Sequence, residues 1–147
     1  MNALIANTTQ SNDTSNPVVT PFFDAESNTF SYVVKDPATK ACAIIDSVLD
    51  LDYASGTISY EGADAIIKYV RDNGLSVEWI IETHAHADHL SAGHYIRDEV
   101  GGKLAIGEQI TTVQKEYGRF YNIDKEIAHD GSQFDQIFVD EETYLVG

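Results

Sequence analysis

Basic residues and cysteine are scarce in this 147-residue sequence, and their scarcity excludes several classes of protein. The chain has 9 Lys and Arg against 24 Asp and Glu, which gives a formal net charge of −15. Phosphate backbones and anionic lipid headgroups attract basic surfaces, so this charge excludes a nucleic-acid-binding protein and disfavours binding to a membrane surface. Cys42 is the only cysteine, so no disulfide can form within the chain, and a reducing compartment is expected.

Long apolar segments are also lacking. No window approaches the ~20 apolar residues of a membrane-spanning helix, and the N-terminus has neither the basic nor the apolar segment of a secretion signal. We therefore expect a cytoplasmic protein. The polar composition of residues 1–17 predicts a disordered leader, and residues 18–147 are expected to form one domain with a hydrophobic core.

The rest of the chain alternates between strand and helix patterns, which is typical of an α/β fold. Two segments rich in apolar and β-branched residues, 29–35 and 41–46, flank a short polar turn and predict a β-hairpin. The polar residues 50–61 indicate an irregular loop. The other expected elements are a helix around 63–70, strands at 77–83 and 103–106, helices at 90–100 and 108–117, and the beginning of a strand at 143–147.

Residues 84–89 carry the chemistry of this sequence and read His-Ala-His-Ala-Asp-His. Side chains two residues apart on an extended segment project to the same side, so His84 and His86 can bind one ion. Asp88 and His89 follow where the chain turns, and they either face a second ion or act behind the first ligands. Imidazole and carboxylate donors suit Zn, Fe(II) or Mn better than Cu(I) or Ca. The sequence therefore predicts a metal site.

Other residues near this motif or elsewhere have less specific signals. Asp46 follows a strand, and it can either orient a ligand histidine or cap its loop. His94 is expected to have a surface or packing role, and the setting of His129 argues against a metal ligand. Cys42 lies in an apolar strand and is expected to be an inert buried thiol. Packing roles are expected for the aromatic residues Tyr117, Phe120 and Tyr121.

The motif also resembles the metal-binding signature of the metallo-β-lactamase superfamily. The matching residues run from Thr83 to Ser91. Further segments, at 28–37, 44–50 and 107–111, are similar to persulfide dioxygenases and bacterial β-lactamase-hydrolase-like proteins of that type. The resemblance covers about residues 22–122. Ser47 differs, because this branch usually has proline at that position.

The resemblance implies an αββα sandwich with a metal centre at the open end of its sheets. For a persulfide dioxygenase it implies one Fe(II), held by His84 and by a later histidine and aspartate, which oxidises a glutathione-type persulfide with O₂ to sulfite. For a dinuclear zinc hydrolase such as a glyoxalase II-like thioesterase, it implies that His84 and His86 hold one ion and that Asp88 and His89 hold the other. Asp88 is the candidate catalytic residue. Fe(II) is favoured, with Zn(II) as the alternative.

In that family, the remaining ligands lie beyond the point where this sequence stops. We therefore expect only the first half of the sandwich, in a domain truncated at its C-terminus. A third hypothesis follows from this expectation: a catalytically incomplete metal-binding module. The expected partner is a small thiol or persulfide, and a homodimer is one assembly that the sequence leaves open.

Overall fold

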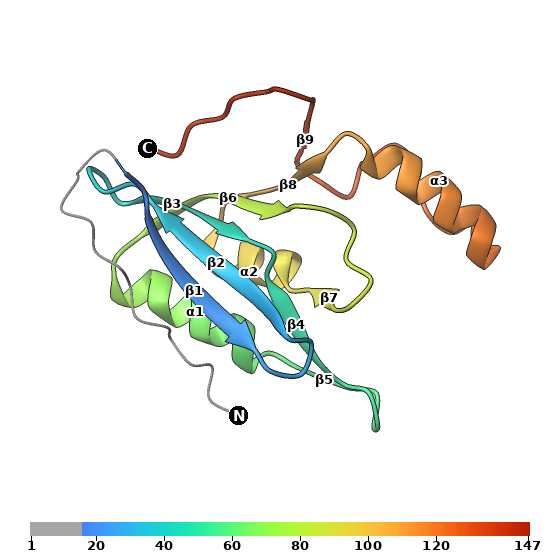
Figure 1. Ribbon diagram of the computed structural model, residues 1–147, viewed down its shortest axis with the longest axis horizontal. Coiled ribbons are helices and arrows are strands. Elements are labelled where there is room, and N and C mark those ends of the chain that lie inside the picture. Colours follow the sequence, from blue (N-terminus) through green and yellow to red (C-terminus); the bar gives the residue numbers. More distant parts are fainter. Residues whose placement is uncertain (1–15) are drawn as a thin grey trace.

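The computed structural model describes residues 16–147, so the expected leader at 1–17 lies almost entirely outside the described residues. Strands and helices alternate along the chain, as expected for an α/β fold (Figure 1). The strands are β1 (Val18–Asp24), β2 (Thr29–Lys35), β3 (Ala41–Ile45), β4 (Val48–Asp52), β5 (Thr57–Ser59), β6 (Ser76–Glu82), β7 (Leu90–Ser91), β8 (Lys103–Gly107) and β9 (Gln136–Phe138). The helices are α1 (Glu61–Asp72), α2 (Gly93–Val100) and α3 (Ile110–Tyr121).

A six-stranded sheet in the order β1-β2-β3-β6-β8-β9 forms the body, and β5-β4-β7 form a small second sheet. The first three strands pair antiparallel, which confirms the predicted hairpin of β2 and β3. From β3 to β9 the strands pair parallel. Parallel neighbours need a crossover connection, which α1 supplies between β3 and β6, and α2 between β6 and β8.

The hydrophobic core lies between this sheet and the two crossover helices, which cover one face of the sheet (Figure 1). Side chains alternate between the faces of a strand, so every second residue meets the helices. Ile44, Ile80 and Leu104 of the sheet pack with Ile66 of α1 and Ile96 of α2, and all five are at most 2% exposed. This packing is the main rigid support for the loops at the strand ends.

The parallel pairing brings two loops together at the carboxyl ends of β3 and β6. Ile45 pairs with Ile81, and the backbone amide of Asp46 donates to the carbonyl of Ile81 at 2.9 Å. The residues that follow each strand are therefore neighbours, although about 40 positions separate them along the chain. This edge of the sheet is where the histidine motif lies.

The expected irregular loop at 50–61 is wrong for most of its length. It contains the β4–β5 hairpin, in which Leu51 pairs with Ile58. A turn closes the hairpin: the amide of Gly56 donates to the carbonyl of Asp52 at 2.7 Å, and Gly56 has a φ of 68°. Polar residues dominate this segment because the hairpin is exposed, so its composition resembled that of a loop.

Two other expectations about the elements need correction. The helix expected at 90–100 begins only at Gly93, because Leu90 and Ser91 pair with β4. Residues 143–147 form no strand, since β9 takes the position beside β8. The tail instead passes Trp79, whose Nε1 donates to the carbonyl of Leu145 at 2.9 Å.

The aromatic residues of α3 do not pack into the core as expected. Tyr117, Phe120 and Tyr121 are exposed and contact one another. In Figure 1, α3 projects away from the sheet. The helix expected at 108–117 runs from Ile110 to Tyr121, so all three aromatic residues lie in its last turns, and the packing role expected for them is wrong.

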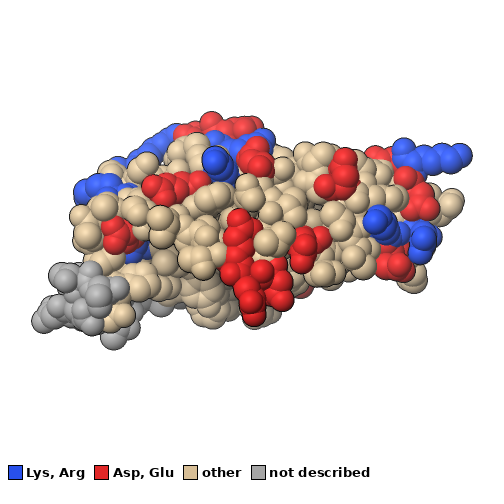
Figure 2. Space-filling model, turned by 90° about the horizontal axis from the view of Figure 1, so that it is seen from above, with Lys and Arg blue, Asp and Glu red and all other residues tan. Residues whose placement is uncertain are grey.

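Charge is unevenly distributed over the surface. Figure 2 shows acidic side chains grouped near the middle of one face, whereas the end where α3 lies carries both basic and acidic side chains and further basic side chains lie toward the opposite end. No helix among the residues that the structure describes is long and apolar enough to span a bilayer.

Candidate metal centre

The predicted metal motif occupies the loop that follows β6, at the carboxyl edge of the parallel strands. The rings of His84 and His86 lie 4.2 Å apart between centroids, and those of His86 and His89 also lie 4.2 Å apart. The structure thus brings the three histidines side by side. Hydrogen bonds to each ring then determine which nitrogen carries a proton and which keeps a lone pair.

His86 is held by two carboxylates. Its Nε2 lies 2.9 Å from Oδ1 of Asp46 and 3.1 Å from Oε2 of Glu82. Ionised carboxylates only accept, so Nε2 must carry the proton, and Nδ1 of the neutral ring keeps its lone pair. The neighbouring Glu82 carboxylate raises the pKa of His86 above its ordinary value, and Asp46 acts in the same direction while burial opposes both.

His84 is oriented through Thr83 by the same aspartate. The hydroxyl of Thr83 donates to Oδ2 of Asp46 at 2.8 Å, and Nδ1 of His84 lies 2.9 Å from that hydroxyl oxygen. Because the hydroxyl proton already points to Asp46, Nδ1 of His84 must donate, which leaves the lone pair on Nε2. Of the two roles that the sequence left open for Asp46, these contacts correspond to the orienting one.

His89 is buried, and its Nδ1 lies 2.9 Å from the carbonyl oxygen of Leu90. A carbonyl only accepts, so Nδ1 carries the proton and Nε2 keeps its lone pair. This Nε2 is buried and has no hydrogen-bond partner among residues 16–147. Such an atom is costly in a folded protein unless a ligand satisfies it, and a metal ion does so.

Asp88 differs from the histidines in its exposure. Its side chain is 56% exposed, Oδ2 accepts a hydrogen bond from the hydroxyl of Thr29 at 3.1 Å, and its carbonyl accepts one from the hydroxyl of Tyr53 at 3.0 Å. A hydrogen bond from its own backbone amide lowers the pKa of Asp88, and the Thr29 bond adds to this. Asp88 therefore keeps an ionised carboxylate on the open side of the cluster.

These residues fit a metal ion. One donor atom from each of His86, Asp88 and His89 lies within 4.8 Å of the others. The set contains nitrogen and oxygen but no sulfur, which suits Fe(II) or Zn(II). His84 lies beside this group rather than within it, so the expected pairing of His84 with His86 on one ion stays a prediction, as does each ligand role.

Sequence reasoning missed several residues that support the motif. Glu82 and Thr83 precede it directly, Thr29 of β2 donates to Asp88, and Ser91 of β7 donates to Glu82. The sequence did contain a signal for Glu82, because this carboxylate lies four residues before His86. The contacts of Ser91 and Thr29 depend on folding and left no signal in the sequence.

The histidines outside the motif do not join it. His94 is exposed, and its Nδ1 lies 3.1 Å from Nη2 of Arg97. His129 lies 3.6 Å from Asp124, close to Gly118 of α3. The position of His94 agrees with the surface role expected for it.

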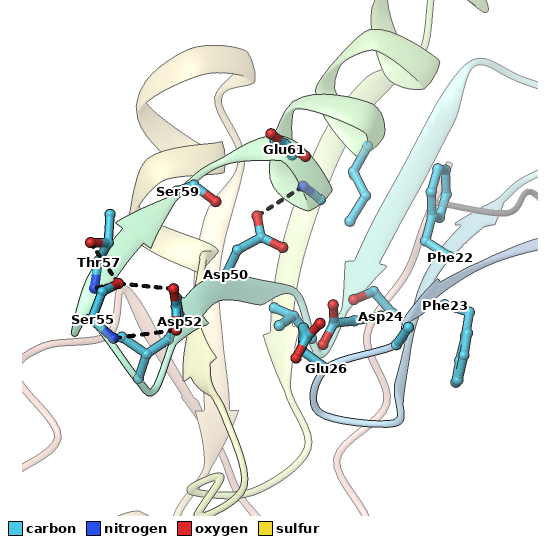
Figure 3. A pocket seen from close by; sticks show the side chains of 16 residues that line it. Phe22, Phe23, Asp24, Glu26, Asp50, Asp52, Ser55, Thr57, Ser59 and Glu61 are labelled. Carbon is cyan, nitrogen blue, oxygen red and sulfur yellow. Dashed lines mark hydrogen bonds between the residues drawn. The ribbon is translucent and has the colours of Figure 1, made fainter. Parts of the chain in front are cut away.

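One cavity in the described part of the chain is lined by no residue of the metal motif. It has a volume of about 750 Å³ and lies between the β1–β2 turn, β4, β5 and α1. Figure 3 shows Asp50 between the beginning of α1 and the turn that carries Asp24 and Glu26. No histidine lines this cavity, but a smaller hollow that shares several of its residues reaches His89.

Comparison with known proteins agrees with this geometry. The family described as the metallo-beta-lactamase superfamily matches residues 25–142. The chain belongs to this superfamily. It is 47% identical over 131 residues to a beta-lactamase hydrolase-like protein of Agrobacterium fabrum, which covers 89% of this chain and 30% of that protein. Glyoxylase B2 of Dictyostelium discoideum is 44% identical over 127 residues, which cover 86% of this chain and 44% of that protein.

Two more distant matches bear on the fold and on the branch. The crystal structure of a B3 metallo-β-lactamase aligns with a TM-score of 0.58 and 18% identity, over 88% of this chain and 56% of that one, which supports the fold. A mitochondrial persulfide dioxygenase of Bos taurus is 24% identical over 95 residues, which cover 65% of this chain and 33% of that protein. The metallo-β-lactamase fold is confirmed, and the chain spans less than half the length of these curated relatives.

Proposed function

We propose that this chain carries the metal motif of a persulfide dioxygenase that uses Fe(II). The observation that supports a metal site best is the group formed by His86, Asp88 and His89, in which two imidazoles and one carboxylate lie together. For Fe(II), the resemblance implies a set made of His84 with a later histidine and a later aspartate. Two histidines and a carboxylate are the donor set of many non-haem Fe(II) oxygenases, because they leave coordination positions open for substrate and O₂. Two further observations support persulfide dioxygenase activity: the resemblance of residues 28–37, 44–50 and 107–111 to persulfide dioxygenases, and the match to the persulfide dioxygenase of Bos taurus.

The reaction would convert a glutathione-type persulfide, O₂ and water into the thiol, sulfite and two protons. Bound Fe(II) supplies the redox chemistry and the site for the sulfur and O₂. The residues of the chain orient the donor atoms. Asp46, through Thr83, directs the Nε2 lone pair of His84 outward, and Asp88 presents an ionised carboxylate on the exposed side of the cluster, where it would face the ion or the substrate.

A dinuclear zinc hydrolase is the second candidate. Glyoxylase B2 supports a hydrolase, at higher identity than the persulfide dioxygenase. His84 lies outside the group of His86, Asp88 and His89, so the four donors can also divide between two ions. In that case His84, His86, Asp88 and His89 would hold the ions, which would supply an activated water for hydrolysis of a thioester. A metal-binding module that needs a further segment for turnover is the third candidate.

Metal content and two substrates separate these candidates. The protein that carries this chain, reconstituted with Fe(II) or Zn(II), is analysed for bound metal and assayed for O₂ uptake with glutathione persulfide and for hydrolysis of a glutathione thioester. About one iron with persulfide-dependent O₂ uptake supports the dioxygenase. Two zincs with thioester cleavage overturn it in favour of the hydrolase, and metal binding without turnover supports the incomplete module.

A matched pair of variants tests whether the metal binds at the histidine motif. His89→Ala removes the buried Nε2 and should lower metal binding, whereas His94→Ala changes an exposed histidine outside the motif and should leave it unchanged. Equal metal content in the two variants would show that the ion binds elsewhere.

A further inference from the structure

Glu82 is a carboxylate beside the motif that the proposed function leaves unused. It is the last residue of β6 and only 4% exposed. Its Oε1 accepts a hydrogen bond from the hydroxyl of Ser91 at 2.5 Å. Its Oε2 is buried without a hydrogen-bond partner in the described part of the chain, 3.1 Å from Nε2 of His86. A buried carboxylate is costly unless a positive group compensates it, so this placement calls for a reason.

The surroundings of Glu82 hold its carboxylate in one position. A Cβ atom added to Gly93 would lie 2.7 Å from Cδ1 of Leu104, 3.1 Å from Oε1 of Glu82 and 3.2 Å from Oγ of Ser91. No side chain fits there without displacing its neighbours. The absence of a side chain at Gly93 therefore leaves room for Ser91 and Glu82 to meet, and core packing at Leu104 limits their movement.

The charge of Glu82 has one partner. Within residues 16–147, the only ion pairs of Glu82 and Asp46 are those with His86. The single proton on Nε2 of His86 points to Asp46, which leaves Oε2 of Glu82 close to the ring but unbonded. A cation bound at Nδ1 would make the ring more positive and its N–H a stronger donor, and the nearby carboxylate would then be compensated.

We infer that Glu82, anchored by Ser91, is a positioning residue that keeps Nδ1 of His86 directed into the metal centre and stabilises the metal-bound ring through its charge. The inference rests on the metal binding of the proposed function. It does not depend on whether the reaction is oxidation or hydrolysis, because it concerns His86 and the ion alone.

The test compares two carboxylates of the same strand in the protein that carries this chain. Glu82→Gln keeps the size of the side chain and removes its charge, whereas Glu78→Gln makes the same change at an exposed position of β6. Dissociation constants for Zn(II) and Co(II) are measured by competition with a chelator. We expect E82Q to bind about 10- to 100-fold more weakly than wild type and E78Q to bind as wild type does.

The Co(II) absorption spectrum gives a readout that a purely structural role would not change. It should shift in E82Q, where the environment of a ligand differs, and stay the same in E78Q. Ser91→Ala should weaken binding in the same direction but less, and it should add little in the E82Q background, because both residues act through one contact. Ser91 is exposed, so this variant tests the inference even if E82Q does not fold.

The possible outcomes separate this inference from the function. A wild-type protein that binds neither metal overturns both. Metal binding by the wild-type chain, with E82Q and S91A unchanged in affinity and spectrum, overturns only the role of Glu82. A lower unfolding temperature with unchanged affinity likewise shows that Glu82 is merely structural.

Discussion

The hydrogen-bond chain from Asp46 to His84 makes a sharp prediction for Asp46→Asn. In the native chain, protons run from Nδ1 of His84 to Thr83 and from Thr83 to Asp46. An asparagine amide in place of Oδ2 would donate to the Thr83 hydroxyl. That hydroxyl would then donate to Nδ1 of His84, which would move the ring proton to Nε2 and remove the lone pair from the metal side. Asparagine also tolerates the φ of 51° at this position, so the backbone is expected to stay intact.

The size of the effect follows from the bonds that metal binding would have to break. Returning His84 to its binding tautomer leaves the Thr83 hydroxyl without its acceptor, which costs about 1 kcal/mol because Thr83 is exposed to water. His86 would donate to an amide rather than to a carboxylate, a loss of about 1 kcal/mol more. A total of about 2 kcal/mol corresponds to roughly 30-fold weaker metal binding.

Two measurements check this prediction. Chelator competition gives the dissociation constant for Zn(II), and long-range ¹H–¹⁵N NMR of the metal-free chain reports the tautomer of His84. Asp52→Asn is a matched control, since Asp52 also accepts bonds from backbone amides and a hydroxyl, but in the β4–β5 turn. The reasoning is refuted if D46N keeps both the native tautomer of His84 and the native affinity.

Three further predictions concern stability and reactivity. Burial raises the pKa of Cys42 to about 11, so its thiol should resist a disulfide reagent at pH 8 until the chain is unfolded, and rapid labelling of the native chain would contradict this. Ile80→Ala should lower the free energy of unfolding in denaturant by about 2–5 kcal/mol, because Ile80 is fully buried, whereas Ile58→Ala at an exposed position should cost less than about 1 kcal/mol. A hydrogen bond from the amide of Leu104 lowers the pKa of Asp135, so its contribution to stability is present above the ordinary aspartate pKa and is lost as the pH falls through the lowered native value. Urea unfolding of Asp135→Asn should therefore differ from wild type near neutral pH and converge with it in acid, and a constant difference at every pH would argue against this role.

Much of the fold was predictable because local patterns and the final structure agree. Apolar residues at helical spacing marked α1, with Ile66 and Val70 in the core and Gly74 in the left-handed conformation that ends it. The β4–β5 hairpin was missed although its strands alternate apolar and polar residues, because they are only five and three residues long and flank a polar turn. The aromatic residues of α3 were expected to pack because of their type, and residue type does not say whether another element covers them.

The sequence alone determined that this chain carries a metal motif. The spacing of His84, His86, Asp88 and His89 is chemically specific without any knowledge of distant residues. It could not determine how those side chains are oriented. Only the parallel pairing of β3 and β6 brings Asp46 to Thr83 and His86, and only the packing of β7 and α2 brings Ser91 to Glu82. The motif shows which side chains can donate to a metal ion. Which nitrogen of each histidine ring carries the proton depends on hydrogen-bond partners that only the folded chain brings into contact.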